Sequence, residues 1–318
     1  MKKALIFSCM IAFLLLLLPL TVLGQPSTTV KQTSAIVKKE EVSKAKTFKI
    51  LRTDTDIIEE ISYDDYIFGV VAAEMPATYE AEALKAQAVA AHTFALHRKA
   101  TNRNREYDIT DDFTVDQAVI TEEKAREKWG AEADAYTEKI KAAVSDTKNL
   151  ALTYNGEIAL SVYHAISFGK TEDCKNVWGG SRAYLTSVSS AGDKLSPNFI
   201  SKKTVTLKEL KEIFKDLKLT DKPTDYFKNI KKTEAGGIKS VTLCGNEVTG
   251  SEIRKRLDLH SSCFEVVYEN GAFQFTVYGY GHGVGMSQNG ANYMAAQGAD
   301  FKEILCHYYT GCKVEEIG

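Results

Sequence analysis

A proline at position 76 separates two helix-forming segments, and this separation constrains the fold more than any other feature of the sequence. The first segment predicts a helix on which three apolar residues share one face with a carboxylic acid, namely Ile67, Val70, Val71 and Glu74. An acid on an apolar face loses hydration, which raises its pKa and suits it to serve as a general acid. The alternative is that the Glu74 side chain turns out to solvent where the helix ends.

The second segment, Ala81 to Lys99, is rich in alanine and predicts a helix that can lie close against its neighbours. Lys85 and His92 are two turns apart on this helix and share one face. They could therefore line the same groove as Glu74 and hold polar groups of a substrate. A solvated face is the alternative for both side chains.

A glycine-rich run near the C-terminus, Gly281 to Gly285, presents a second group of polar residues. Its glycines permit positive backbone torsions and the close approach of a ligand. The run lacks the spacing of a dinucleotide-binding loop and has no Walker lysine, so phosphate binding is not expected. We interpret His282, Ser287 and Gln288 as groove residues, although a lone histidine is more often structural.

The middle of the chain predicts a β-hairpin, because two strand-like runs, Leu150 to Tyr154 and Ile158 to Tyr163, flank an Asn-Gly turn. The hairpin leads into a loop of mainly small and polar residues. Aromatic residues follow this loop, and aromatic faces pack well against sugar rings. The candidate glycan-binding residues of this region are His164, Lys170 and Tyr184, with Trp178 as either a sugar platform or a core residue.

Two segments resemble the two signatures of the stage II sporulation protein D family, whose catalytic members are lytic transglycosylases. The first runs from Glu74-Met-Pro76 through Glu82-Ala-Leu-Lys-Ala-Gln-Ala-Val-Ala-Ala91. The second is Gly279-Tyr-Gly-His-Gly-Val-Gly-Met-Ser-Gln-Asn-Gly-Ala291. They occur in the family's order, and the resemblance extends over residues 47–318.

The resemblance implies that Glu74 is the catalytic acid and that Lys85 lies in the substrate groove. The family usually has Arg-Thr-Tyr-Ala where this chain has His92-Thr-Phe-Ala95. Histidine is a smaller, titratable cation, so activity that depends on it would fall as pH rises through about 6 to 7. A second departure is Phe168, in a loop where relatives usually carry small residues.

The implied activity is cleavage of peptidoglycan glycan strands between N-acetylmuramic acid and N-acetylglucosamine, with a 1,6-anhydro product and no cofactor. The resemblance places it on peptide-stripped strands during forespore engulfment, with an amidase and a membrane scaffold as partners. The rival class is a non-catalytic amidase enhancer that grips the wall. The intact Glu74-Met-Pro76 and Lys85 favour the enzyme, whereas His92 favours the rival.

Several classes of ligand are not expected. A net charge of −2 gives no reason to expect nucleic acid as a partner. Some relatives place zinc-binding cysteine and histidine in the region of residues 103–118, but this chain has neither there, so no metal is expected. A site built from His164, Cys174, His282 and Cys306 lacks zinc-motif spacing.

Cys306 and Cys312 could form a disulfide across a turn or be small buried hydrophobes.

The N-terminus predicts a membrane anchor over residues 1–24, because two lysines precede an apolar run about as long as a bilayer-spanning helix. A cleaved signal peptide is the alternative. A polar segment over residues 25–46 predicts a flexible tether. The domain would then face outward from a single-pass anchor in the cell membrane, in the mother-cell membrane facing the forespore if the sporulation role holds.

Residues 47–318 predict one α+β domain, with a mixed or antiparallel sheet packed against helices and a long substrate groove. Strands are expected at Thr47 to Arg52 and Ile57 to Ile61, ahead of the first helix. Glu122 to Thr147 is strongly helical, with charges that would form a solvated face.

Overall fold

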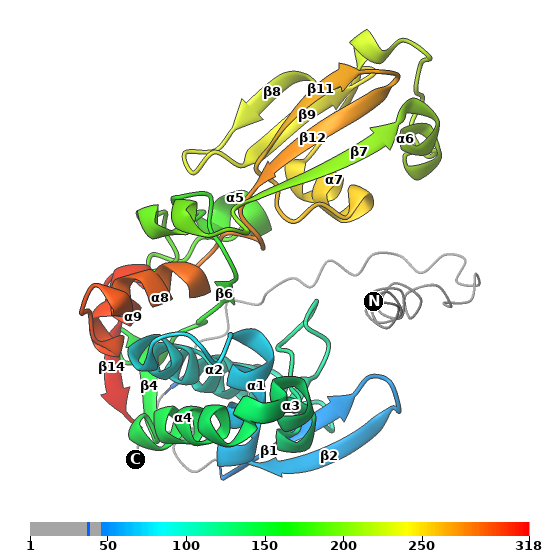
Figure 1. Ribbon diagram of the computed structural model, residues 1–318. Coiled ribbons are helices and arrows are strands. Elements are labelled where there is room, and N and C mark those ends of the chain that lie inside the picture. Colours follow the sequence, from blue (N-terminus) through cyan, green and yellow to red (C-terminus); the bar gives the residue numbers. More distant parts are fainter. Residues whose placement is uncertain (1–36, 39–45, 318) are drawn as a thin grey trace, which may run out of the picture. The chain divides into compact units, whose positions relative to one another are not determined.

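The computed structural model describes residues 37–38 and 46–317 (Figure 1). The predicted anchor lies outside the described residues. In the described part of the chain, no helix combines the length and apolar character that crossing a membrane requires. Three residues of the predicted tether, Val37, Lys38 and Lys46, are described. Val37 is buried and its carbonyl accepts from the Ile158 amide at 2.8 Å, while Lys38 forms an isolated antiparallel β-bridge with Glu157.

The two helices around Pro76 form as predicted. Helix α1, Tyr63–Glu74, begins where the Ser62 hydroxyl accepts from the Asp65 amide at 3.2 Å, and ends where Met75 becomes extended ahead of the proline. Helix α2 spans Ala81–Thr101 and is buried along most of its length. Because alanine occupies so many of its positions, neighbouring elements approach it closely, and it lies at the centre of the larger of two apolar cores.

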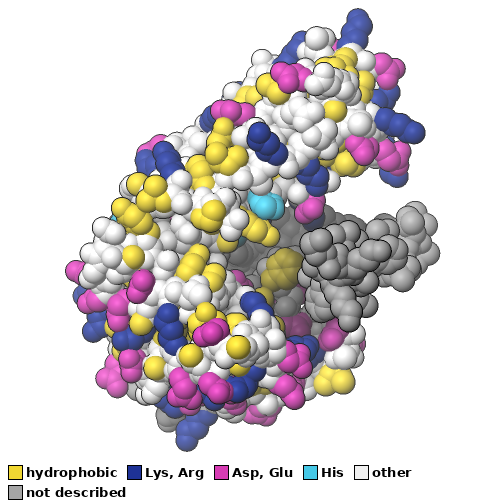
Figure 2. Space-filling view, viewed as in Figure 1, with side chains coloured by type: hydrophobic (Ala, Val, Ile, Leu, Met, Phe, Trp, Pro, Cys, Tyr) yellow, Lys and Arg dark blue, Asp and Glu magenta, His cyan; other side chains and the backbone are white. Residues whose placement is uncertain are grey.

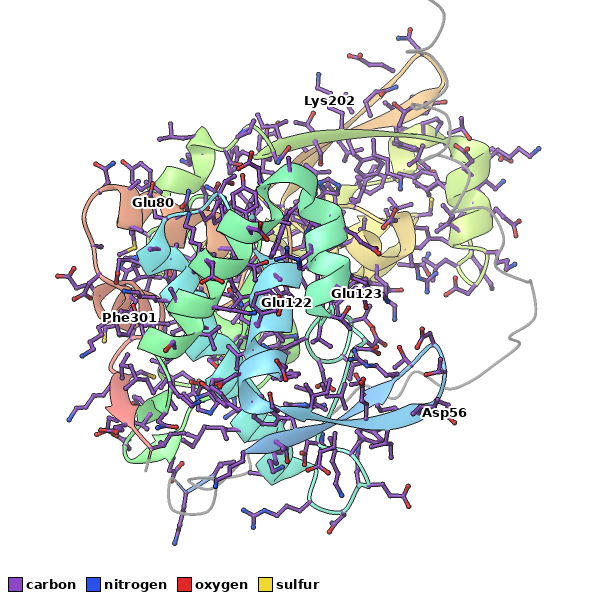
Figure 3. All side chains as sticks on the ribbon, turned by 60° about the horizontal axis from the view of Figure 1, so that its bottom comes forward. Asp56, Glu80, Glu122, Glu123, Lys202 and Phe301 are labelled. Carbon is purple, nitrogen blue, oxygen red and sulfur yellow. The ribbon has the colours of Figure 1, made fainter. Side chains whose placement is uncertain are left out.

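The predicted long helix over residues 122–147 is broken in two. Helix α3, Glu122–Trp129, ends at Gly130, whose φ of +57° a residue with a side chain rarely adopts, and α4 continues as Ala133–Asp146. The polar face is at the surface, as expected: Glu123 is exposed, and Glu122 pairs with Lys141 at 2.9 Å (Figure 3).

Within residues 46–317 the strands form five small sheets, where the sequence predicted one mixed or antiparallel sheet. Most pairs are antiparallel, and β1–β3 and β6–β13 are parallel. The sheets of the larger core comprise β1 (Thr47–Arg52), β2 (Ile57–Ser62), β3 (Ile109–Thr110), β4 (Leu150–Tyr154), β5 (Glu157–Ile158), β6 (Tyr163–His164), β13 (Met286–Ser287) and β14 (Lys313–Glu316). Local patterns predicted β1, β2 and β4, whereas β3, β13 and β14 were not predicted, and the division into sheets depends on pairings between distant segments.

A second apolar core lies within residues 205–277. Two three-stranded antiparallel sheets and two helices enclose it (Figure 1). Its elements are β7 (Ile200–Thr206), α6 (Leu207–Ile213), β8 (Lys228–Lys232), β9 (Ile238–Leu243), β10 (Asn246–Val248), α7 (Gly250–Leu257), β11 (Phe264–Glu269) and β12 (Ala272–Tyr278). Strand β12 leads directly into the glycine-rich run, so this core supports one side of the candidate site.

The remaining α-helices of the described residues are α5 (Cys174–Trp178), α8 (Gln288–Ala296) and α9 (Phe301–Tyr308). The short parallel pair of β6 and β13 places Tyr163 opposite Met286 and His164 opposite Ser287. This pairing joins the predicted hairpin region to the glycine-rich run. Adjacent strand residues point to opposite faces, so Tyr163 and His164 serve two different surroundings.

Candidate functional site

Glu74 is the last residue of α1 and its side chain is largely enclosed by protein. Its carboxylate accepts hydrogen bonds from the Ala118 amide at 3.2 Å and from Nε2 of Gln288 at 3.3 Å. Ile67, Val70 and Val71, which share its helical face, are fully buried. Burial raises the pKa of Glu74 and outweighs the two hydrogen bonds, which lower it. The sequence pattern predicted this environment.

Two tyrosines and a glutamine lie beside Glu74. The Tyr66 hydroxyl donates to Oε1 of Gln117 at 2.8 Å, and Nε2 of Gln117 donates to the Tyr163 hydroxyl at 2.7 Å. Burial raises the pKa of both tyrosines well above the ordinary value, and the nearby Glu74 charge adds to this effect. Both phenols therefore stay neutral, and the Tyr163 hydroxyl, which accepts from Gln117, keeps its proton to donate near the acid. Sequence analysis missed Tyr66 and Gln117, because nothing local marks them as neighbours of Glu74.

Gln288 reaches Glu74 because the start of α8 is held firmly. The Ser287 hydroxyl donates to Oδ1 of Asp193 at 2.8 Å and accepts from the Gly290 amide at 3.2 Å. Asp193 is fully buried, and its other oxygen accepts from the Ser167 amide at 3.0 Å. Ser287 is thus a positioning residue, and Asp193, which no sequence motif indicated, ties two loops together.

A further amide borders this contact. Oε1 of Gln87, on α2, accepts from Nε2 of Gln288 at 3.4 Å. Nε2 of Gln87 is buried and has no hydrogen-bond partner among the residues that the structure describes. A buried donor without a partner is costly, and this one lies next to the residue that contacts Glu74. It is available to an acceptor that enters the site.

The structure does not bring Lys85 or His92 to Glu74. Lys85 pairs with Glu82 and Asp146, each at 3.0 Å. His92 is buried: its Nδ1 bonds to the Leu150 carbonyl at 2.8 Å, and its ring packs edge-on against Tyr63 at 4.5 Å. Burial lowers the pKa of His92 to about 4, so it is neutral near pH 7. The expectation that it supplies a titrating groove cation is corrected, because it serves as a satisfied core residue.

Tyr184 and Lys170 also have structural partners. The buried Tyr184 hydroxyl accepts from the Leu160 amide at 2.9 Å, and its ring lies 5.0 Å from that of Tyr154. The Lys170 ammonium is partly exposed and pairs with Glu234. Tyr184 is therefore a core residue rather than the sugar platform that the sequence suggested, while Lys170 lies at the surface.

A second cluster forms on the other face of β6. The ring centroid of His282 lies 5.6 Å from that of His164 and 5.1 Å from that of Trp178. His164 is buried, and its Nδ1 bonds to the Val284 carbonyl at 3.1 Å. Burial lowers the pKa of His164 to about 4 and that of His282 to about 3. Trp178 keeps 38% of its surface exposed, which leaves a face for a ligand.

Phe168, the second departure from the family pattern, packs beneath the glycine-rich run. A Cβ atom at Gly279 would come within 2.8 Å of its ring, and one at Gly283 within 3.1 Å. Both glycines also have positive φ. The aromatic ring therefore fits only because the run above it lacks side chains, and the glycines here serve packing as well as backbone conformation.

Glu172 is a second buried carboxylic acid that sequence analysis did not single out. It is 2% exposed, and burial raises its pKa. Three donors compensate for that burial: the Thr233 hydroxyl, the Asn176 amide and the Gly237 backbone. Its own amide donates to the Gly283 carbonyl at 2.7 Å. Glu172 thus fastens the glycine-rich run to the β8–β9 connection.

No group of three or more His, Cys, Asp or Glu in the described part of the chain is placed to hold a metal ion. The segment of residues 103–118 instead contributes Gln117 and the Ala118 amide to the surroundings of Glu74. The five described cysteines are free thiols. Cys306 and Cys312 are close in space without a disulfide, and the Cys306 thiol donates to the Cys312 carbonyl at 3.5 Å.

Comparison with known sequences identifies the family of proteins to which this fold and site belong. A family model described as stage II sporulation protein matches residues 52–154, which contain Glu74 and helix α2. The chain belongs to the stage II sporulation protein D family. It is 33% identical over 334 aligned positions to stage II sporulation protein D of Bacillus subtilis strain 168, covering 99% of this chain and 96% of that protein.

Two other relatives bracket this similarity. Stage II sporulation protein D of Bacillus amyloliquefaciens is 34% identical over 270 residues, covering 84% of this chain and 78% of that protein. A protein named amidase enhancer, from Bacillus subtilis strain 168, is 25% identical over 301 residues, covering 76% of this chain but only 39% of its own length.

Proposed function

We propose that this protein is a lytic transglycosylase that cleaves peptidoglycan glycan strands between N-acetylmuramic acid and N-acetylglucosamine. The observation that carries the proposal is Glu74: an enclosed acid with a raised pKa, held by the Ala118 amide and by Gln288. A carboxyl that stays protonated at higher pH than an ordinary glutamic acid can protonate a glycosidic oxygen. Membership in the sporulation family supports a role in the cell wall during sporulation.

One carboxyl suffices for this reaction. Glu74 donates its proton to the leaving glycosidic oxygen as the bond from that oxygen to C1 breaks, and positive charge develops at C1 and the ring oxygen. The resulting carboxylate then accepts the proton of the muramic C6 hydroxyl, whose oxygen bonds to C1. The product is a 1,6-anhydro ring, Glu74 is protonated again, and no water is consumed.

The neighbours of Glu74 support this cycle. The Ala118 amide and Gln288 stabilise the carboxylate that forms when Glu74 gives up its proton. The Tyr66 hydroxyl is committed as a donor to Gln117, whereas the neutral Tyr163 hydroxyl accepts from Gln117 and keeps its own proton to donate without adding charge. The unpartnered amide nitrogen of Gln87 is a donor for a sugar acceptor.

The proposed cellular setting follows the family. The protein acts on peptide-stripped strands during forespore engulfment, after an amidase has removed the stem peptides and together with a membrane scaffold. The apolar run of residues 1–24 anchors it in the cell membrane with the domain outside.

A specific observation favours a second function, that of a non-catalytic wall-binding amidase enhancer. Neither Lys85 nor His92 lies beside Glu74, so two expected substrate contacts are absent from the site. The similarity to the protein named amidase enhancer points in the same direction. If this second function holds, the protein binds the glycan, but Glu74 does not catalyse its cleavage.

Mass spectrometry of purified glycan strands decides between the two. The full chain is incubated with peptide-free and peptide-bearing strands, and anhydromuramoyl product is measured for the wild type and for Glu74→Gln. General acid–base assistance is worth about 10²–10⁴ in rate, so the variant should form little or no product while remaining folded, with a melting curve as the control. A folded Glu74→Gln protein with wild-type turnover would refute the mechanism. A wild type that binds strands but never cuts them would establish the binding function.

A further inference from the structure

Arg254, on helix α7, is a partly buried cation without an ion-pair partner in the described part of the chain. Its one hydrogen bond runs from Nε to the His260 carbonyl at 3.1 Å. Burial lowers its pKa, because the charged guanidinium is poorly hydrated. Arg256, two residues further on, instead pairs with Asp216 and Glu252. A partly buried guanidinium whose remaining donors have no hydrogen-bond partner among the described residues gains when an anion reaches it.

Two hydrogen bonds fasten Arg254 to the glycine-rich run. The His260 carbonyl that accepts from Arg254 also accepts from the Gly281 amide at 3.0 Å. The guanidinium is thereby held next to His282, and its charge helps to lower the pKa of His282 and of His164. Arg254 therefore belongs to the same cluster as His164, His282 and Trp178, although its helix, α7, packs on the second apolar core.

Exposed aromatic rings surround this cluster. The ring of His260 stacks on that of Tyr280 at 4.3 Å with an interplanar angle of 9°, and Tyr280 is 46% exposed. The Trp178 ring also lies beside His282, with the two ring centroids 5.1 Å apart. Figure 2 shows that apolar side chains also lie at the surface on one face of the molecule. Flat exposed rings are suited to stack against the apolar faces of sugars.

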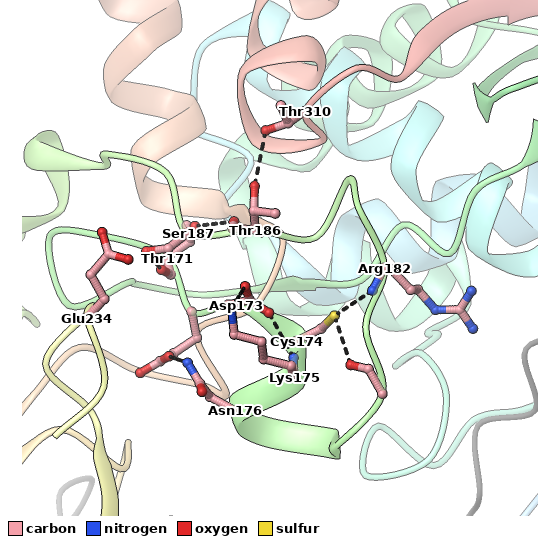
Figure 4. A network of polar contacts seen from close by, with 12 residues as sticks. Thr171, Asp173, Cys174, Lys175, Asn176, Arg182, Thr186, Ser187, Glu234 and Thr310 are labelled. Atoms are coloured by element: carbon pink, nitrogen blue, oxygen red, sulfur yellow. Dashed lines mark hydrogen bonds and ion pairs between the residues drawn. The ribbon is translucent and has the colours of Figure 1, made fainter. Parts of the chain in front are cut away.

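The short helix that carries Trp178 at its end, α5, is fixed in place. Helix α5 begins at Asp173, whose side chain accepts from the Lys175 amide at 2.9 Å. The Cys174 thiol donates to the Gly180 carbonyl and accepts from the Arg182 amide, each at 3.3 Å (Figure 4). The turn that follows Trp178 is thus tied back to α5, and the indole is presented from the end of a helix that is held in place.

His164 adds a hydrogen-bond acceptor. Its Nδ1 is committed as a donor to the Val284 carbonyl, so Nε2 carries the lone pair. Nε2 is buried and has no partner among the described residues. The cluster therefore combines one permanent cation, one unused acceptor and exposed aromatic faces. Because both histidines are neutral near pH 7, Arg254 supplies its fixed positive charge.

We propose that Arg254, Trp178 and Tyr280 form a subsite for an acidic sugar, with the guanidinium binding its carboxylate and the rings packing against its faces. The inference rests on the proposed function in one respect: the acidic sugar is a muramic acid residue of the same glycan strand. In a peptide-free strand the lactyl group of muramic acid is a free carboxylate. In a peptide-bearing strand that group is an uncharged amide, so Arg254 distinguishes the two.

Tryptophan fluorescence can report binding at this subsite directly. The chain has two tryptophans, and Trp129→Phe leaves Trp178 alone. Adding Glu74→Gln prevents turnover, so binding is measured without cleavage. The full chain is titrated with three ligands of matched length: peptide-free strands, peptide-bearing strands, whose carboxylates lie on the peptide, and neutral chito-oligosaccharide.

Arg254→Gln should weaken binding of peptide-free strands by about tenfold or more, as expected for charge-assisted hydrogen bonds, and leave chito-oligosaccharide binding unchanged. Arg254→Lys should restore part of the affinity. The matched control is Lys255→Gln, which removes one charge from an exposed neighbouring position of α7 and should have no effect. An equal loss for neutral and acidic ligands, or no loss for either, overturns the proposal. A loss for peptide-bearing strands as large as that for peptide-free strands assigns the contact to peptide carboxylates and also overturns it.

If Arg254→Gln fails to fold, the wild type still decides. The preference for peptide-free over neutral ligand should decline as salt rises from about 0.05 to 0.5 M, because ions screen the guanidinium–carboxylate attraction. A preference that does not change with salt, or no preference at all, overturns the subsite. Fluorescence reports binding whether or not the protein cuts. If the protein binds peptide-free strands selectively but forms no anhydro product, the transglycosylase proposal is wrong and the subsite proposal stands.

Discussion

Gln288 donates a hydrogen bond from Nε2 to Oε2 of Glu74 at 3.3 Å, across 214 residues of chain. One contact thus joins the two segments by which the family resemblance was found. It links the end of α1 to the start of α8, and Ser287 and Asp193 hold the latter in place. The bond stabilises the carboxylate over the protonated acid, so it sets the pH range in which Glu74 can donate a proton.

Removing this bond should move the alkaline limb of the pH–rate profile. Gln288→Met has similar length and no hydrogen-bond donor, so Glu74 loses a contact that lowers its pKa. The pKa should rise further, and activity should persist to higher pH than in the wild type. The measurement is the initial rate of anhydro product formation against pH. A limb that stays in place, or moves to lower pH, would separate Gln288 from the function of the acid.

The part of the site that could be predicted from sequence is the part with local periodicity. Glu74 falls on a regular apolar stripe ahead of a proline, and both its helix and its raised pKa follow from that pattern. The partners of Glu74 lie far away in the chain. Gln288 was indicated by the resemblance, whereas Tyr66 and Gln117 meet Glu74 through tertiary packing that no spacing reveals.

His92 shows why the same reasoning failed on α2. On an alanine-rich helix every face can pack, so periodicity does not distinguish a groove from the core. The Leu150 carbonyl requires a donor where β4 begins, and His92 supplies it. The prediction of a single sheet was wrong for a related reason. Strands β6 and β13 have only two residues each, and their pairing depends on contacts between distant parts of the chain.

Glu74 should make stability depend on pH with a definite sign. Its pKa is raised in the folded protein, so the folded state holds the proton after the unfolded chain has released it. The free energy of unfolding therefore falls as pH rises from the ordinary carboxyl range through the raised pKa. The side chain of Glu74→Gln cannot ionise. The melting temperature of this variant, relative to that of the wild type, should therefore increase as pH rises through this range. A constant difference between pH 4 and pH 8 would contradict the shift.

His92→Arg should destabilise the protein instead of restoring a substrate contact. His92 is buried and neutral, and a guanidinium there would be an uncompensated buried charge, which costs about 3–5 kcal/mol. We expect a lower denaturation midpoint and no change in the alkaline limb of the remaining activity. His92→Gln, which can still donate to the Leu150 carbonyl, is the control and should lose less stability. A stable His92→Arg protein with tighter glycan binding would return this residue to the groove.

Lys85 provides a direct test of the resemblance against the structure. Its ammonium is partly exposed and paired with two carboxylates, Glu82 and Asp146. Exposed ion pairs contribute at most about 1 kcal/mol, so Lys85→Met should change stability little and leave the rate of anhydro product formation within about twofold. A loss of turnover of a hundredfold in a folded variant would show that Lys85 leaves these partners to contact the glycan, as the family suggests.

Glu172→Gln tests whether Glu74 is the sole catalytic acid. Both acids are enclosed and both have raised pKa values, so burial alone does not assign the role. Glu172 accepts from three donors, including the Thr233 hydroxyl and the Asn176 amide, whereas Glu74 has two long hydrogen bonds. A carboxyl satisfied in this way is suited to hold a loop, and its proton is not offered to a substrate.

Glu172→Gln should therefore lower the melting temperature by loosening the glycine-rich run, yet form anhydro product at a rate within about tenfold of the wild type, well above Glu74→Gln. Rates are compared per folded molecule, at a temperature below the unfolding of either variant. Equal loss of product in both variants, with both folded, would mean that the reaction uses two carboxyls.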